Sequence, residues 1–162
     1  MFGVKSKIES LWNEWYQSGE LRQVRIFPMG YICNHACPMC WRENLTPEMR
    51  QKLSKAAFTT DLQLKDYLKI MATLPKTVDR IVLCGGGEPL LFRDIGILLE
   101  AIKKENKEGH VITNGTRLTP ELTDLLIRSN WDALYISVNA ATKSVYKVIN
   151  GADNYDLVLG NI

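Results

Sequence analysis

Three cysteines lie close together early in the sequence, at a spacing that only a few kinds of chemistry use. They are Cys33, Cys37 and Cys40, in the stretch "CNHACPMCW" (residues 33–41), with gaps of three and then two residues. Thiolates are soft ligands that suit iron–sulfur cores, and a cubane is usually held by four of them. Three thiolates on one loop, with Pro38 to turn the chain, would bind three irons and leave the fourth without a protein ligand. Such an iron can coordinate a substrate or cofactor, so the pattern favours a catalyst over an electron carrier.

Three other interpretations use the same residues. A zinc site could add His35, although structural zinc sites usually draw on two separated pairs of ligands. The segment "CPMC" (residues 37–40) could be a thioredoxin-like redox pair, which would not require Cys33. Incidental or buried cysteines are the third interpretation, although three in a polar loop with a proline do not resemble core packing. The fourth cysteine, Cys84, ends an apolar run and is interpreted as a packing residue.

A run of glycines, "GGGEP" (residues 85–89), follows a short apolar segment. It lacks the Lys-Ser/Thr of a phosphate loop and does not match G-x-G-x-x-G, so by itself it indicates only a tight turn. After a strand, however, it offers backbone carbonyls without side chains, next to the acidic Glu88. An array of this kind suits a cationic amine.

The segments that must position these residues alternate between two patterns. Short runs rich in Val, Ile and Leu predict strands at residues 23–28, 80–84, 110–113 and 133–138. Apolar residues at helical spacing predict helices at residues 61–74, 94–106 and 120–128. This alternation predicts right-handed βαβ units and a parallel sheet, which is an α/β fold.

Helix-start signals sharpen two of these predictions. Thr60 and Gln63 form a possible capping box for the first helix. Thr119 and Pro120 supply an N-cap and a first-turn proline for the third.

In parallel sheets of this kind, the loops after the carboxyl ends of the strands carry the functional site. The cysteines follow the first predicted strand, and the glycine run follows the second. The segments "TNGT" (residues 113–116) and "SVNA" (residues 137–140) end the third and fourth strands. All four groups of residues are therefore expected at one edge of the sheet.

Composition limits the class of protein. The chain has 162 residues, 46% of them hydrophobic, and a net charge of +2. This length fits a single domain with one core. There is no basic stripe that would predict nucleic-acid binding, no signal peptide and no run long enough to span a membrane. Four cysteines, three of them crowded together, are a poor disulfide framework, so we expect a cytoplasmic protein.

The combination of motifs resembles the radical S-adenosylmethionine (radical SAM) enzymes. "CNHACPMC" looks like that family's C-x3-C-x2-C cluster motif, and "GGGEP" looks like its GGE motif after the second strand. "VITNGT" and "LYISVNA" resemble the ends of its third and fourth strands, especially in the group of the molybdenum-cofactor enzyme and the peptide-modifying maturases. The closing stretch, "VYKVINGADNYDLVLGNI", is also similar to that group, so the resemblance covers about residues 23–162.

The resemblance implies two cofactors, a 4Fe–4S cluster and S-adenosylmethionine. Cys33, Cys37 and Cys40 would bind three irons, and the amino and carboxylate groups of S-adenosylmethionine would chelate the fourth. One electron would then cleave a carbon–sulfur bond and give a 5'-deoxyadenosyl radical, which abstracts hydrogen from an unidentified substrate. A one-electron donor such as flavodoxin or ferredoxin is the implied partner.

The resemblance also suggests which residues hold S-adenosylmethionine. Gly86, Gly87 and Glu88 would hold its amino end. Met39 occupies the place where the family often has an aromatic residue near the adenine.

Two further strand ends would contribute to the same site. Thr113 and Ser137 would reach the carboxylate or the ribose. Asn139 stands where many relatives carry an acid, so a ribose contact there would lose charge but keep an acceptor.

The family's fold is a six-stranded partial barrel, of which this sequence supplies about four βα units. We expect residues 1–22 to form an amphipathic helix and lead-in. Residues 23–162 would form a parallel-stranded partial (β/α) barrel that lacks the C-terminal strands and ends within a helix at residues 155–162. The chain could be truncated, a half that another chain or segment completes, or a non-catalytic remnant. An iron–sulfur or zinc-binding module without radical chemistry is the alternative function.

Overall fold

A computed structural model of the protein describes residues 21–49, 51 and 62–162. The predicted helix and lead-in at residues 1–22 therefore fall almost entirely outside the described residues. Among the described residues, no helix combines the length and apolar character needed to cross a bilayer.

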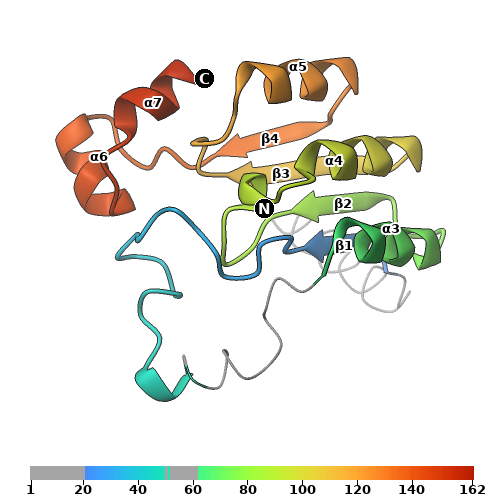
Figure 1. Cartoon of the computed structure of the whole chain (residues 1–162), viewed down its shortest axis with the longest axis horizontal. Coiled ribbons are helices and arrows are strands. Elements are labelled where there is room, and N and C mark those ends of the chain that lie inside the picture. Colours follow the sequence, from blue (N-terminus) through green and yellow to red (C-terminus); the bar gives the residue numbers. More distant parts are fainter. Residues whose placement is uncertain (1–20, 50, 52–61) are drawn as a thin grey trace, which may run out of the picture.

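Four parallel strands form one sheet, in the order in which they occur in the chain (Figure 1). They are β1 (Gln23–Ile26), β2 (Arg80–Leu83), β3 (Glu108–Thr113) and β4 (Ala133–Ile136). Ile26 is in register with Leu83, and Val111 is in register with both Leu83 and Leu134. The predicted parallel α/β arrangement is confirmed.

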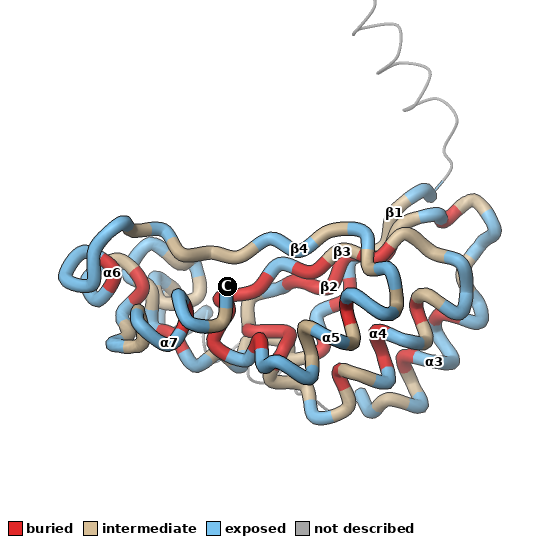
Figure 2. Tube along the Cα trace, turned by 90° about the horizontal axis from the view of Figure 1, so that it is seen from above, coloured by how far each residue is buried: buried red, intermediate tan, exposed pale blue. Residues whose placement is uncertain are grey.

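The helices cover only one face of this sheet, as Figure 2 shows for the three that connect the strands. Those three are α3 (Leu64–Thr73), α4 (Ile95–Lys104) and α5 (Pro120–Arg128). The core lies between them and the sheet, where Leu98, Leu99 and Ile102 of α4 are fully buried, as are Ile81 and Leu83 of β2. Side chains alternate between the two faces of a strand, so every second strand residue enters this core.

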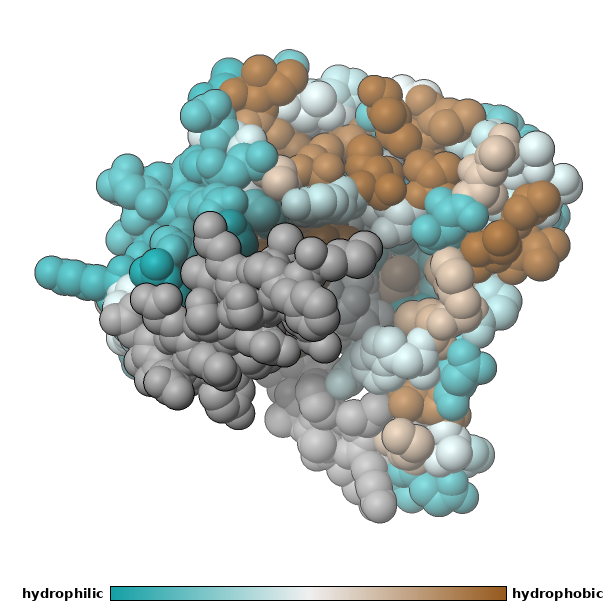
Figure 3. All heavy atoms as spheres, turned by 180° about the vertical axis from the view of Figure 1, so that it is seen from behind, coloured by the Kyte–Doolittle hydropathy of each residue, from teal (hydrophilic) through white to brown (hydrophobic). Residues whose placement is uncertain are grey.

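The opposite face of the sheet is not covered by α3, α4 or α5. Along β3, the buried Gly109, Val111 and Thr113 alternate with His110 and the exposed Ile112. Seen from behind, this side displays hydrophobic surface beside polar surface (Figure 3). A sheet with helices on one face and an open face on the other is the arrangement of a partial barrel.

Three more helices lie at the carboxyl-end side of the strands. A short 3-10 helix, η1 (Pro89–Leu91), follows the glycine run, and α6 (Lys143–Asn150) and α7 (Tyr155–Gly160) follow β4. Sequence periodicity did not predict α6, which Thr142 caps by accepting the Val145 N–H.

Several predicted boundaries differ from the structure. The N-cap of α3 is Gln63, and its N–H is accepted by the Asp66 carboxylate at 2.9 Å. Thr60, the first residue of the predicted capping box, lies outside the described residues, and Gln63 forms a capping box with Asp66, three residues after it. Helix α7 ends at Gly160 with Asn161 as C-cap, so the predicted continuation of this helix to residue 162 is wrong.

Other boundaries agree with the prediction. Helix α5 has the predicted bounds, and the Thr119 side chain accepts the Leu122 N–H as expected for its cap.

Candidate active site

The three clustered cysteines lie on the loop that leaves the carboxyl end of β1. Cys33, Cys37 and Cys40 are all free thiols, each partly exposed, and all three line one pocket. The loop is a series of tight turns, in which the Cys40 N–H donates to the Cys37 carbonyl and the Glu43 N–H to the Cys40 carbonyl. Consecutive turns bring side chains that are several residues apart onto one side of the loop.

The thiols are close enough to influence one another. Burial raises the pKa of Cys37, and the neighbouring Cys33 and Cys40 raise it further. In the described part of the chain, however, no three Cys, His, Asp or Glu side chains converge closely enough to hold a single metal ion. A cubane has its ligands on separate corners and needs them farther apart than a single ion does. Three soft donors on one loop that line one pocket are the ligand type that iron–sulfur clusters use.

His35, the extra ligand of the zinc interpretation, is used elsewhere. Its side chain is buried, its Nε2 lies 3.1 Å from Asn154 Nδ2, and its ring packs edge-on against Tyr146. Burial lowers the pKa of His35. The ring joins the cysteine loop to the α6–α7 region, so this geometry does not favour a zinc site with His35.

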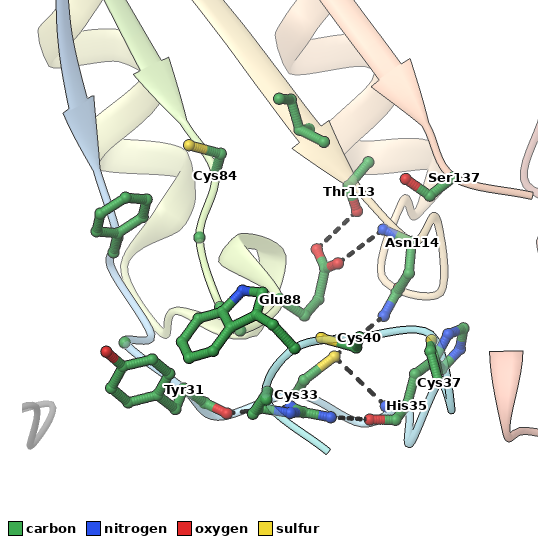
Figure 4. Close-up of a pocket in the computed structure, with 18 of the residues that line it drawn as sticks. Tyr31, Cys33, His35, Cys37, Cys40, Cys84, Glu88, Thr113, Asn114 and Ser137 are labelled. Atoms are coloured by element: carbon green, nitrogen blue, oxygen red, sulfur yellow. Dashed lines mark hydrogen bonds between the residues drawn. The ribbon is translucent and has the colours of Figure 1, made fainter. Parts of the chain in front are cut away.

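The thioredoxin-like interpretation requires a helix that begins at the cysteine pair. Residues 37–44 instead form turns, and Cys37 Sγ donates to the Asn150 carbonyl at 3.3 Å. Cys84 is buried at the end of β2 and lies apart from the other three cysteines (Figure 4). Its interpretation as a packing residue agrees with this burial.

The glycine run packs against the cysteine loop at distances that no side chain would allow. A Cβ on Gly87 would lie 2.3 Å from the Ile32 carbonyl oxygen, and one on Gly86 would lie 2.7 Å from the Tyr31 ring. The next residue, Glu88, donates its N–H to the same Ile32 carbonyl at 2.9 Å. The glycines therefore let two functional loops meet backbone to backbone.

Glu88 is the acidic residue of this run, and its carboxylate is buried inside the protein. Oε1 accepts from Thr113 Oγ1 at 2.6 Å and from the Leu90 N–H at 3.0 Å, and Oε2 accepts from the Asn114 N–H at 2.7 Å. Figure 4 shows this side chain directed toward Thr113 and Asn114. Burial raises the pKa of Glu88, and these hydrogen bonds offset part of that effect. In this arrangement the carboxylate joins the glycine loop to the end of β3.

The remaining predicted residues are distributed unevenly around the pocket. Thr113, Ser137 and Asn139 line it together with Gly86 and the other glycines of the run. Met39 is exposed and is not among the residues that line it. The structure thus brings together all of the predicted site residues except Met39.

The pocket itself is an open cavity of about 510 Å³ at the carboxyl ends of the strands. Its walls come from all four strand ends, with Phe27 and Arg25 from the first and Ile112 from the third. A volume of this size is in the range that binds a small molecule.

Arg42, two residues after the last of the three clustered cysteines, also belongs to the site. Its guanidinium donates to the Tyr31 carbonyl at 3.0 Å and also to the His35 carbonyl, and it pairs with Glu43. Burial alone would lower the pKa of Arg42, but Cys33 and Glu43 raise it overall. A fixed positive charge therefore lies beside Cys33, at the edge of the thiol cluster.

Asparagines are the residues that sequence reasoning missed. Asn34 lies on the cysteine loop and donates to Thr116, and Asn114 donates to Asn34. The Asn150 carbonyl accepts from Cys37. Asn114 follows a predicted strand directly, so its place at the strand end was a usable signal. Asn150 lies in α6, which the periodicity did not reveal.

An open parallel sheet with a thiol-lined pocket at its strand ends defines an α/β partial barrel with its site at the carboxyl edge. Residues 27–162 match the Radical SAM superfamily, and the chain belongs to that family.

Several relatives are similar to this chain over most of its length. It is 30% identical to a probable GTP 3',8-cyclase of Thermococcus kodakarensis, over 80% of this chain and 39% of that protein. It is 27% identical to the mycofactocin maturase MftC of Mycolicibacterium smegmatis, over 80% of this chain and 30% of the maturase. The chain thus spans well under half the length of these relatives.

A solved structure supports the fold. Streptococcus suis SuiB, in a crystal structure with the precursor peptide SuiA, superimposes with a TM-score of 0.67 over 91% of this chain and 31% of SuiB. At 18% identity, this similarity concerns the fold alone.

Proposed function

We propose that this chain is the core of a radical SAM enzyme that holds a 4Fe–4S cluster through Cys33, Cys37 and Cys40. The observation that carries the proposal is that three adjacent thiols line the same pocket as the glycine run and the ends of β3 and β4. When bound, the cluster supplies one electron that cleaves S-adenosylmethionine to methionine and a 5'-deoxyadenosyl radical, which removes hydrogen from the substrate.

The protein's own residues have three tasks in this proposal. The first is to place a positive charge next to the proposed cluster ligands, whose combined negative charge it would offset, and Arg42 beside Cys33 supplies it. The second is to hold the loop shape, through the bonds from Arg42 to the Tyr31 and His35 carbonyls. Both tasks are served by one side chain that is only 11% exposed.

The third task is to hold S-adenosylmethionine across the strand ends. We assign its amino end to the backbone of Gly86 and Gly87, and its carboxylate or ribose to Ser137, Asn139 and the end of β3 at Thr113. The role of Glu88 is then to fix the glycine loop against β3, because its oxygens already accept three hydrogen bonds. Met39, exposed on the cysteine loop, would contact adenine only if that loop closes over the cofactor.

The proposal includes a partner and a location. A one-electron donor such as flavodoxin or ferredoxin would reduce the cluster. A further segment or chain would complete the barrel by adding strands at an edge of the sheet, beside β1 or β4. The four cysteines are free, as a reducing compartment such as the cytoplasm would keep them.

The test is anaerobic reconstitution with iron and sulfide, followed by dithionite and S-adenosylmethionine and by measurement of 5'-deoxyadenosine. Wild type should bind about four irons per chain and form product. Cys37→Ala should lose product, whereas the matched variant Cys84→Ala should retain the iron, because Cys84 lines the same pocket but lies apart from the other three cysteines. Zinc in place of iron, or equal product from Cys37→Ala and wild type, would contradict the proposal. A loaded cluster without product would support the alternative, a cluster-binding module or a half barrel that needs completion.

A further inference from the structure

Three side chains form a closed ring of hydrogen bonds between the cysteine loop and the loop after β3. Asn34 Nδ2 donates to Thr116 Oγ1 at 2.8 Å, and Thr116 Oγ1 donates to Asn114 Oδ1 at 2.7 Å. Asn114 Nδ2 donates back to Asn34 Oδ1, also at 2.8 Å. Every member of the ring uses both its donor and its acceptor, so the ring holds Asn34, between two of the cysteines, in one place.

The ring also fixes the orientation of the Asn114 amide. Its Oδ1 accepts from both the N–H and the Oγ1 of Thr116, at 3.0 Å and 2.7 Å, so its NH2 group must point the other way. The backbone of Asn114 is held separately, because its N–H donates to the buried Glu88 carboxylate. The residue itself is buried, so water does not compete for the amide.

The NH2 group held in this way is directed at a cysteine. Asn114 Nδ2 lies 3.8 Å from Cys33 Sγ, within hydrogen-bond distance for sulfur. Cys33 Sγ also accepts the His35 N–H at 3.4 Å and lies beside the Arg42 guanidinium. Cys37, in contrast, donates its own S–H to a carbonyl. Cys33 is therefore the cysteine that donors surround.

We propose that Asn114 is a positioning residue whose side-chain N–H, oriented by the Thr116 backbone N–H that donates to its Oδ1, raises the reduction potential of the cluster. This inference rests on the proposed cluster at Cys33, Cys37 and Cys40. Reduction adds negative charge to the cluster and its thiolates, and hydrogen bonds to the sulfurs stabilise the reduced form more than the oxidised form. An easier reduction allows a weaker one-electron donor to supply the electron.

Two variants distinguish the effect of the Asn114 side-chain N–H from the effect of the hydrogen-bond ring. Asn114→Leu has a similar size and removes the N–H that points at Cys33. Thr116→Val breaks the ring but keeps the Thr116 backbone N–H, which donates to Asn114 Oδ1 and keeps the amide orientation. A purely structural role predicts similar effects of the two variants, whereas the proposed role predicts different potentials.

The measurement is an EPR-monitored redox titration of the reconstituted proteins, without S-adenosylmethionine. Asn114→Leu should lower the reduced-to-oxidised ratio about tenfold at a fixed potential, a shift of about 59 mV for one electron. Thr116→Val should remain near wild type. Equal potentials for Asn114→Leu and wild type, or an equal shift in Thr116→Val, would overturn the inference.

A second measurement uses wild type alone and covers the case in which Asn114→Leu does not load a cluster. Protein labelled with ¹⁵N only in asparagine side chains should show, in pulsed EPR of the reduced cluster, a ¹⁵N coupling through the N–H···S bond. Absence of this coupling would also overturn the inference while leaving the proposed function intact. A wild-type chain that binds no iron–sulfur cluster would instead remove the proposed function, and this inference with it.

Discussion

The helix-covered face of the sheet and the loops at its carboxyl edge both contain buried residues, but with different chemistry. The core between sheet and helices is built of apolar side chains such as Leu83, Leu98 and Val111. The buried polar residues of the described part all lie at the carboxyl edge or on the loops and helix next to it: His35, Glu88, Thr113, Asn114, Thr116 and Asn150. Within the described residues, the single buried side-chain polar atom without a partner is Arg80 Nε, at the opposite end of β2.

This difference in chemistry gives the two regions different tasks, stabilising the fold and fixing the positions of the site loops. Apolar burial is non-directional and holds the strands and helices together without fixing the angle of a side chain. Hydrogen bonds are directional, and a buried polar group that loses its partner costs about 1–3 kcal/mol. The core therefore supplies most of the stability, and the polar edge determines where the cysteine loop and the glycine run lie.

The largest effect on stability is expected from the core. Leu98→Ala should lower the free energy of unfolding by about 2–5 kcal/mol, because Leu98 is fully buried and its loss leaves a cavity. Urea denaturation should detect this, with Ile97→Ala as a control, since Ile97 is exposed on the same helix and should change stability by less than about 0.5 kcal/mol. At low temperature the folded Leu98→Ala protein should bind as much iron as wild type. A marked loss of iron in the folded variant would show that the core also positions the site, contrary to the division proposed above.

The next largest effect is expected where the glycine run touches the cysteine loop. Gly87→Ala should cost about 1–3 kcal/mol, because its Cβ would lie 2.3 Å from the rigid Ile32 carbonyl oxygen and must displace a loop. It should also reduce iron incorporation, unlike Leu98→Ala. Gly160→Ala is the matched control, since nothing lies within 4 Å of its Cβ, and it should be neutral or stabilising by up to about 1 kcal/mol. Full iron incorporation by Gly87→Ala would show that the loop can move without harm to the site.

The buried carboxylate at the edge should have a smaller cost and a distinct pH dependence. Glu88→Gln keeps the shape but places an amide NH2 where one of the donors now bonds, so it should cost about 1–2 kcal/mol at neutral pH. Iron incorporation should fall less than in Gly87→Ala, because the backbone contacts of the glycine run remain.

The sign of the pH effect follows from the raised pKa of Glu88 in the folded protein. The folded state binds the proton more tightly than the unfolded state, so this group's contribution to stability grows as pH falls. The growth should extend from above the folded-state pKa down to about 4.3, the ordinary glutamate value. The stability difference between wild type and Glu88→Gln should therefore widen as pH falls through this window. A constant difference, measured by thermal unfolding at several pH values, would show that the pKa of Glu88 is not raised.

The difference between the apolar core and the polar edge also explains which features of the structure could be predicted from the sequence. The strands and α5 were predictable because runs of Val, Ile and Leu, and the Thr119–Pro120 start, are local signals. Placement of the cysteines, glycine run and Ser137 at one edge followed from the rule that parallel strands end together. These are consequences of apolar pattern and topology.

The polar edge was less predictable because its contacts join residues that are far apart in the chain. Asn34 and Asn114 are 80 positions apart, and no periodicity links them. Glu88 was expected to face a ligand amine, and its three internal donors become visible only when β2 and β3 are placed side by side. Directional bonds between loops thus carry information that one local segment does not contain.

The smallest effect is expected from a polar group that lies outside the edge. Thr119 caps α5 by accepting the Leu122 N–H at 3.3 Å, and it is exposed. Thr119→Ala should cost about 1 kcal/mol in urea denaturation, because one helix donor loses its acceptor. Thr119 lies only three residues from Thr116, yet it takes no part in the ring with Asn34 and Asn114, so the reduction potential and the iron content should not change. If Thr119→Ala shifted the potential as much as Asn114→Leu, the potential would depend on the stability of the β3–α5 connection rather than on a donor aimed at Cys33. The division between a stabilising core and a positioning edge would then no longer hold.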